Sequence, residues 1–184
     1  MHSRDRMTSP AAAIAAAMML TLGSPAVAAD APAFGQPIAP ADLSSWDISI
    51  GPDGAGLPPG RGTAAQGEAV FMAKCQACHG EKGAGKPNDA LVGGFGTIAS
   101  NGPAVKTVGS YWPYATTLFD YVRRAMPWNA TKSLTGDELY AVSAYILHLN
   151  GVIGADDVLD AQSLPKVKMP NRDGFILFPR QGKL

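Results

Sequence analysis

Cys75-Gln76-Ala77-Cys78-His79, residues 75–79, is the most informative segment of this chain. Cys75 and Cys78 are three positions apart, so their thiols face the same side of a helical turn. His79 follows directly and can point a ring nitrogen at a metal held beside that turn. A Cys-x-x-Cys-His pentapeptide is the pattern of covalent haem attachment. It predicts one haem c, bound through thioethers at Cys75 and Cys78, with His79 as an axial ligand of the iron.

Three other interpretations of the two cysteines stay open at this point. A redox-active dithiol does not need His79, and it usually lies in a βαβ context that is absent here. A zinc site needs two further ligands, and the only other histidines are His2 and His148. A structural disulfide is common in exported proteins and fits the spacing. The histidine directly after Cys78 favours haem over all three.

The second axial ligand of the iron is expected to be a methionine, because Met opposite His raises the reduction potential of electron-carrying haems. Met72 lies on the same short helix as the motif and cannot reach the opposite face of the haem. Met126 is followed by a proline that restricts the backbone, which makes it the expected ligand. Met169 has the same Met-Pro context beyond the last helix and is the alternative. His148 lies off the apolar stripe of its helix and is expected to be a surface or internally paired histidine.

The hydrophobic pattern predicts three main helices, over residues 63–75, 116–125 and 135–150. Thr135 and Glu138 have the spacing of a capping box at the start of the third. The side chains expected to face inward are Leu118, Tyr121 and Val122 in the second helix, and Leu139, Val142, Tyr145, Ile146 and Leu149 in the third.

Between the first two helices, residues 80–109 form a long Gly-rich loop. A loop of that length inside a compact domain needs a reason, and wrapping a large flat cofactor supplies one. Before the first helix, Trp46, Ile48 and Ile50 alternate either as a short strand or as anchors of an arm on the domain surface.

The rest of the chain divides into segments around this domain. Residues 1–29 have the basic start, the apolar run and the small residues before a cleavage site that mark a signal peptide. We therefore expect export to the periplasm. Residues 30–62 are a Pro- and Gly-rich arm, 63–150 the haem domain, and 151–184 a tail that packs on the domain or on a partner.

The charge of the chain excludes one class of partner. The formal net charge is +0, and without residues 1–29 it is about −1. Binding of nucleic acid requires a strong basic field, so no nucleic-acid partner is expected. No segment of the processed chain is long and apolar enough to span a membrane.

Several further side chains are candidates for the surroundings of the haem. Aromatic residues near Pro113 can line the pocket or pack in the core, and one of two adjacent arginines can neutralise a propionate. Lysines can surround an exposed haem edge where a partner docks, or simply be solvated. These candidates are Tyr111, Trp112, Tyr114, Arg123, Arg124, Lys82, Lys86 and Lys132.

The segment Gly67-x-x-x-Phe71-x-x-x-Cys75-x-x-Cys78-His79 resembles the first helix of class I cytochromes c. That resemblance implies an all-α fold with three main helices around one haem, long loops and extended terminal arms. It also implies that the first helix crosses the last at the glycine, against an aromatic that corresponds to Tyr145. Met126-Pro127 corresponds to the family's axial methionine.

A narrower resemblance covers about residues 42–180. It rests on Trp46-Asp47, Gly56-Leu57-Pro58-Pro59-Gly60, Tyr111-Trp112-Pro113-Tyr114-Ala115-Thr116-Thr117, Asp120-Tyr121, Arg123-Arg124-Ala125-Met126-Pro127, Ala144-Tyr145-Ile146-Leu147 and Lys168-Met169-Pro170-Asn171-Arg172-Asp173-Gly174-Phe175. These segments resemble the cytochrome subunits of the Sox sulfane dehydrogenase and of periplasmic sulfite dehydrogenases. The Sox subunit typically carries two haems, whereas this chain has one motif, which favours the sulfite-type partner or a short relative of the Sox subunit.

The resemblance implies an electron-transfer protein rather than an enzyme. A molybdenum-cofactor sulfite or sulfane dehydrogenase subunit would donate single electrons, and a downstream cytochrome or oxidase would accept them. The alternative is a haem-based catalytic subunit that binds thiosulfate, peroxide or a small gas at an open iron position. The Met126-Pro127 context argues against that alternative.

Overall fold

The computed structural model describes residues 35 and 37–176, so the expected signal peptide, 1–29, lies outside the described residues. The chain divides into a unit that ends at Asp42 and a second unit, Leu43–Leu184, which holds the helical domain. A short helix, α2, spans Pro40–Leu43. Within the part of the chain that the structure describes, there is no helix of the length and hydropathy that a membrane span requires.

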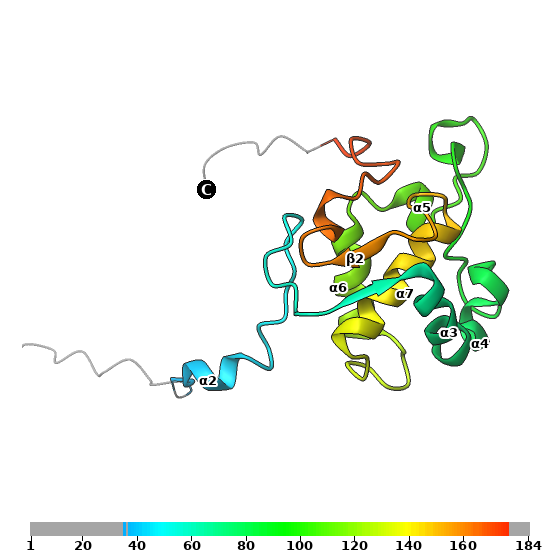
Figure 1. Cartoon of the computed structure of the whole chain (residues 1–184). Helices are drawn as coiled ribbons and strands as arrows, with labels where there is room; N and C mark the ends of the chain where they lie inside the picture. Colours follow the sequence, from blue (N-terminus) through cyan, green and yellow to red (C-terminus); the bar gives the residue numbers. More distant parts are fainter. Residues whose placement is uncertain (1–34, 36, 177–184) are drawn as a thin grey trace, which may run out of the picture. The chain divides into compact units, whose positions relative to one another are not determined.

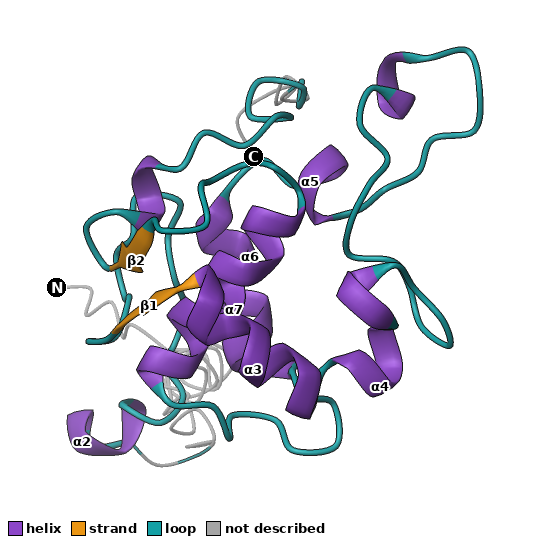
Figure 2. Cartoon of the chain, turned by 45° about the vertical axis from the view of Figure 1, so that its right-hand side comes forward, coloured by secondary structure: helices purple, strands orange, loops and turns teal. Residues whose placement is uncertain are grey.

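The centre of the domain is the packing of α3, Ala64–Lys74, against α7, Gly136–Leu149 (Figure 2). Gly67 lies where these helices touch, and a Cβ atom at this position would overlap the carbonyl oxygen of Ala141. Glycine is required here because the two backbones come too close to leave room for a side chain. The class I expectation of a glycine crossing is confirmed.

One turn further along α3, Phe71 is fully buried against Tyr145 of α7, with the ring centroids 5.4 Å apart. The predicted capping box at the start of α7 is present. The Thr135 hydroxyl accepts from the backbone N–H of Glu138, and the Glu138 carboxylate accepts from the backbone N–H of Thr135 at 2.9 Å. Two donors at the helix start are thus satisfied, which explains why the sequence located this boundary.

Helix α6, Ala115–Ala125, packs on α7 through Phe119, whose ring centroid lies 4.6 Å from that of Tyr140. The expected inward positions Leu118 and Val122 are buried. The expectation for Tyr121 is wrong, because its side chain is 48 % exposed. Phe119 occupies the buried face instead, and Tyr121 packs edge-on against Trp112, with 5.7 Å between ring centroids.

A two-stranded antiparallel sheet joins the arm to the tail (Figure 1). Strand β1, Arg61–Thr63, pairs with β2, Val158–Asp160, with Gly62 opposite Leu159. After β2 the chain forms a short helical turn, η3, Leu164–Lys166, in which the side chain of Leu164 is completely buried. The first part of the tail therefore covers one side of the helical core.

The residues before β1 are fastened to α6 by polar contacts rather than by a strand. The backbone N–H of Ile50 donates to Asp120 at 3.2 Å, and Arg123 donates to the carbonyl oxygen of Ile48 at 3.3 Å. Ile50 packs against the core, whereas Trp46 is 74 % exposed. Of the two interpretations of this alternating segment, anchoring on the domain is correct for Ile48 and Ile50.

The remaining helical turns lie in and around the Gly-rich loop: α4 at Gln76–His79, η1 at Glu81–Gly83, η2 at Thr97–Ala99 and α5 at Val108–Tyr111. Asn150, at the end of α7, holds this loop in place. Its amide group donates to the Leu91 carbonyl oxygen at 3.1 Å, and its amide oxygen accepts from the Gly93 backbone N–H at 3.2 Å. The Asn150 side chain is buried, and its two bonds take the place of the hydrogen bonds that water would otherwise make to the loop backbone.

Replacing Asn150 by alanine is expected to lower the free energy of unfolding by about 1–3 kcal/mol, because the partly buried Leu91 carbonyl and Gly93 N–H lose their partner. Urea denaturation of the haem-loaded protein, followed by far-UV circular dichroism, measures the change. The exposed Asn101 provides a matched control, for which Asn101→Ala should stay within ~0.5 kcal/mol of wild type. Equal stability of the two variants would show that the loop does not depend on Asn150.

Candidate functional site

The Cys-x-x-Cys-His motif lies on two consecutive helical segments. Helix α3 ends at Lys74, Cys75 donates its backbone N–H to the Phe71 carbonyl oxygen at 2.8 Å, and α4 carries the rest of the motif. His79 donates its backbone N–H to the Cys75 carbonyl oxygen at 3.0 Å. The motif is thus held on one helical turn, as its spacing predicts. Helix α3, which leads into that turn, is itself anchored at Gly67 and Phe71.

The loop after the motif folds back and orients His79. The Nδ1 atom of His79 lies 2.9 Å from the carbonyl oxygen of Asp89, which can only accept, so Nδ1 carries the proton and donates. The lone pair of the ring is then on Nε2, which is the nitrogen free to bind a metal. A backbone carbonyl that fixes the tautomer of a ligating histidine is a recurrent feature of metal sites.

The two thiols do not have the properties of a redox dithiol. Cys75 and Cys78 are free cysteines rather than a disulfide. Burial raises the pKa of the Cys75 thiol to about 11, so it stays protonated at neutral pH. Reactive dithiols work through a lowered pKa, which makes this arrangement unfavourable for disulfide exchange. Among the described residues, no cluster of three or more His, Cys, Asp or Glu side chains could hold a metal ion on its own.

Met126 follows α6 directly and remains only partly covered by the protein. Its backbone N–H donates to the Val122 carbonyl oxygen at 3.1 Å, which ties the methionine to the end of the helix. Met126, Cys75, Leu91 and Trp112 share one property, because each packs against the hydrophobic core while staying partly exposed. We refer to these four partly exposed side chains as the apolar edge.

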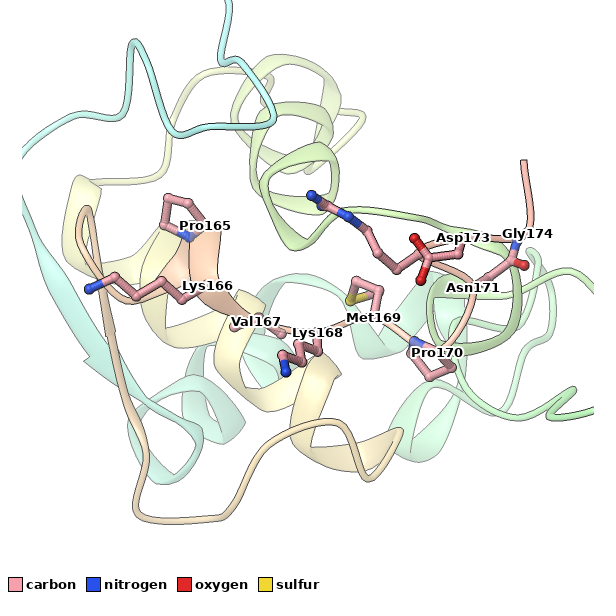
Figure 3. Close-up of a pocket in the computed structure, with 10 residues that line it drawn as sticks. Pro165, Lys166, Val167, Lys168, Met169, Pro170, Asn171, Asp173 and Gly174 are labelled. Atoms are coloured by element: carbon pink, nitrogen blue, oxygen red, sulfur yellow. The ribbon is translucent and has the colours of Figure 1, made fainter. Parts of the chain in front are cut away.

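Met169, the alternative ligand, has a different environment. Its side chain is 3 % exposed and belongs to the hydrophobic core. Figure 3 shows it in the tail segment 165–174, which lines a cavity of about 820 Å³. None of Cys75, His79 and Met126 lines that cavity. The contacts of Met169 are those of a core residue that fills space between helices.

The aromatic and arginine candidates are mostly engaged with the arm and the tail. Arg172 lies over the ring of Tyr114, with 4.1 Å to the centroid, and Asn171 donates to the Tyr111 carbonyl oxygen at 2.7 Å. Arg124 pairs with Asp120 at 2.8 Å. The segment 111–114 is therefore a docking point for the tail, a role that the sequence did not indicate. Of the aromatic cluster, Trp112 is the member on the partly exposed apolar edge.

The donor set fits a covalently bound haem. Two free thiols lie on one turn, the imidazole donates from Nδ1 and leaves Nε2 available, and Met126 supplies a partly exposed thioether. Thiols and an imidazole at this spacing match haem attachment, and a thioether is a suitable soft ligand for its iron. Phe119, Tyr140 and Asn150, which the sequence reasoning missed, complete the core and the loop behind these groups.

Comparison with known proteins identifies related chains. Residues 62–146 match the family model described as cytochrome C oxidase, cbb3-type, subunit III. The solved structure titled "Crystal Structure of the Sulfane Dehydrogenase SoxCD from Paracoccus pantotrophus" contains a chain that is 39 % identical. The match covers 82 % of this chain and 74 % of that chain, with a TM-score of 0.75. Among curated proteins, a search finds no match.

Proposed function

Because this chain belongs to the class I c-type cytochrome family, binds haem c covalently and serves electron transfer, we propose that it accepts single electrons from a molybdenum-dependent sulfite or sulfane dehydrogenase. It then passes them to a downstream cytochrome or oxidase of the respiratory chain. The observation that carries this proposal is the 39 % identity to a chain of the sulfane dehydrogenase SoxCD over 82 % of the sequence. Because the match covers 82 % of this chain, it extends beyond the haem domain, residues 63–150, and supports a shared type of partner rather than a shared haem motif alone.

We assign the cofactor to four residues. Cys75 and Cys78 form the thioethers, and His79 and Met126 are the axial ligands. Haem c supplies a reversible one-electron couple when bound. The hydrogen bond from Nδ1 of His79 to the Asp89 carbonyl oxygen orients the ring and leaves Nε2 as the nitrogen that would bind the iron.

The stoichiometry of the proposed reaction is simple. Oxidation of sulfite to sulfate takes one oxygen atom from water and releases two protons and two electrons. A one-electron carrier must therefore be reduced twice for each sulfite. The molybdenum subunit does the sulfur chemistry, and this chain needs only to bring its haem close enough to receive each electron.

The compartment is also part of the proposal. Residues 1–29 are expected to direct export, with cleavage after Ala28 or Ala29, and covalent haem attachment through Cys-x-x-Cys-His suits an exported protein. We place the processed chain in the periplasm, where the dehydrogenase that donates electrons would have to be as well.

Anaerobic stopped-flow mixing tests the electron donor. The oxidised holo-cytochrome is mixed with its molybdenum sulfite dehydrogenase that has been reduced by sulfite, and haem reduction is followed by absorbance. We expect reduction that saturates with donor concentration and is at least ~10-fold faster than with an unrelated reduced flavoprotein of similar potential, because specific docking adds to the encounter rate. Equal rates with both donors would reject the proposed partner while leaving the cytochrome identity intact.

A further inference from the structure

We propose that the electron donor docks on a surface formed by Trp46 of the arm together with Trp128 and Lys132 of the loop that carries Met126. This tryptophan patch rests on the proposed function and names the surface that serves it. Trp128 is 84 % exposed and Trp46 is 74 % exposed. A tryptophan that is buried removes ~150–250 Å² from water, so two that stay in solvent leave a large apolar area uncovered.

Lys132 contacts one of the tryptophans and shares a loop with the other. Its Nζ atom lies 5.8 Å from the centroid of the Trp46 ring, within the range of a cation–π contact. Lys132 and Trp128 belong to the same loop between α6 and α7, in which residues 128–133 are all exposed. Trp46 comes from the arm, so the patch combines segments far apart in the sequence.

The backbone at Lys132 gives a second, independent indication. Lys132 has a φ of +61°, in the left-handed region that residues other than glycine rarely adopt. Such a conformation costs about 1 kcal/mol or more, and it concentrates at binding and switch sites. Here it belongs to the residue whose ammonium lies over Trp46, so the strained position and the exposed aromatic surface coincide.

The charges around the patch favour a stably bound protein subunit as its occupant. Residues 125–135 contain a single charged side chain, Lys132, and on the arm the charge next to Trp46 in sequence is Asp47. The nearest arginine on α6, Arg124, is already paired with Asp120 at 2.8 Å. The centres of stable interfaces are poor in charge and rich in tryptophan, whereas transient docking relies on many charges. The matching surface on the donor should be apolar, with one carboxylate placed to meet Lys132.

The position of the patch explains why the donor would use it. Trp128 is two residues from Met126, the proposed axial ligand, and the whole loop is short. A protein that covers Trp128 binds two residues from Met126, whose side chain is partly exposed. Its redox centre would then approach the haem from the side of the proposed methionine ligand.

The test uses the full-length holo-cytochrome and the sulfite-reduced molybdenum dehydrogenase. Trp128→Ala and Trp46→Ala are measured separately, because Trp128 is two residues from Met126 whereas Trp46 belongs to the arm. We expect each variant to raise the apparent Kd for the donor by about 30-fold, the typical effect of losing an interface tryptophan. Phe95→Ala, which removes an aromatic that is 50 % exposed on the Gly-rich loop, is the matched control and should change Kd less than twofold.

The outcomes separate the surface from the function. If wild type is reduced rapidly but both tryptophan variants keep its Kd within twofold, the patch is not the docking surface. The same conclusion follows if the double variant Lys82→Glu/Lys86→Glu weakens donor binding and the tryptophan variants do not. If wild type itself reacts no faster than with an unrelated donor, the proposed function fails and the assignment of the patch to this donor fails with it. A normal haem spectrum in each variant ensures that the effect is one of docking.

Discussion

Replacing both Cys75 and Cys78 by serine is expected to abolish covalent attachment of haem, because serine hydroxyls do not add to vinyl groups under the conditions in which thiols do. Each thiol lies on the same short turn before His79, so each single variant should retain one thioether. The partly exposed apolar edge at Leu91, Trp112 and Met126 would lose its cover. Exposing such side chains costs up to ~1.5–3 kcal/mol each, a large part of the 5–15 kcal/mol that stabilises a typical domain.

Haem staining of a denaturing gel and the pyridine haemochrome spectrum measure the attachment, and thermal unfolding measures the loss of stability. Ala77→Ser is the matched control, since it adds a hydroxyl inside the same motif and keeps both thiols. It should retain covalent haem at the wild-type level. Covalent haem in the double serine variant would refute the assignment of Cys75 and Cys78.

Replacing Met126 by alanine is expected to lower the reduction potential by a few hundred millivolts. Axial ligands tune haem potentials over ~0.8 V, and a thioether opposite histidine lies toward the high end. The absorption band near ~695 nm that accompanies Met–iron ligation should vanish from the oxidised protein. The fold should persist, because Met126 is only partly buried and ties to α6 through its backbone.

Met169→Ala is the control that the structure supplies. Met169 is 3 % exposed in the core, so its truncation should cost about 2–5 kcal/mol of stability and leave the absorption band in place. Met126→Ala should therefore change the reduction potential and the spectrum, whereas Met169→Ala should change the stability. If the band is lost in Met169→Ala and kept in Met126→Ala, Met169 rather than Met126 is the ligand of the iron. Absence of the band from wild type as well would favour an open iron position and haem-based binding of thiosulfate, peroxide or a small gas.

Local patterns in the sequence predicted what depends on neighbouring residues. Thr135 and Glu138 marked the start of α7 because the capping bonds run between residues three apart. Helical spacing places Gly67 and Phe71 on one face of the first helix, and the resemblance to class I cytochromes c indicated that this face meets the last helix. The motif at residues 75–79 indicated haem c because its chemistry is complete within one turn.

Contacts between segments far apart in the chain could not be predicted from local sequence patterns. Gly62 pairs with Leu159 across the arm and the tail, and Asn150 binds the loop at Leu91. Tyr121 was expected to face inward and is half exposed. Periodicity tells which residues share a face of a helix, but not which segment from elsewhere covers that face.

The haem motif and the helices beside it were therefore determined by the sequence alone, since thiol spacing, helical periodicity and capping act over a few residues. The tertiary structure decided the rest. It placed Met169 in the core, fastened the tail to Tyr111 and Tyr114, and left Trp46 and Trp128 in solvent. The reason is physical: burial is a property of the assembled surface, because the atoms that cover a side chain come from parts of the chain that no local pattern connects.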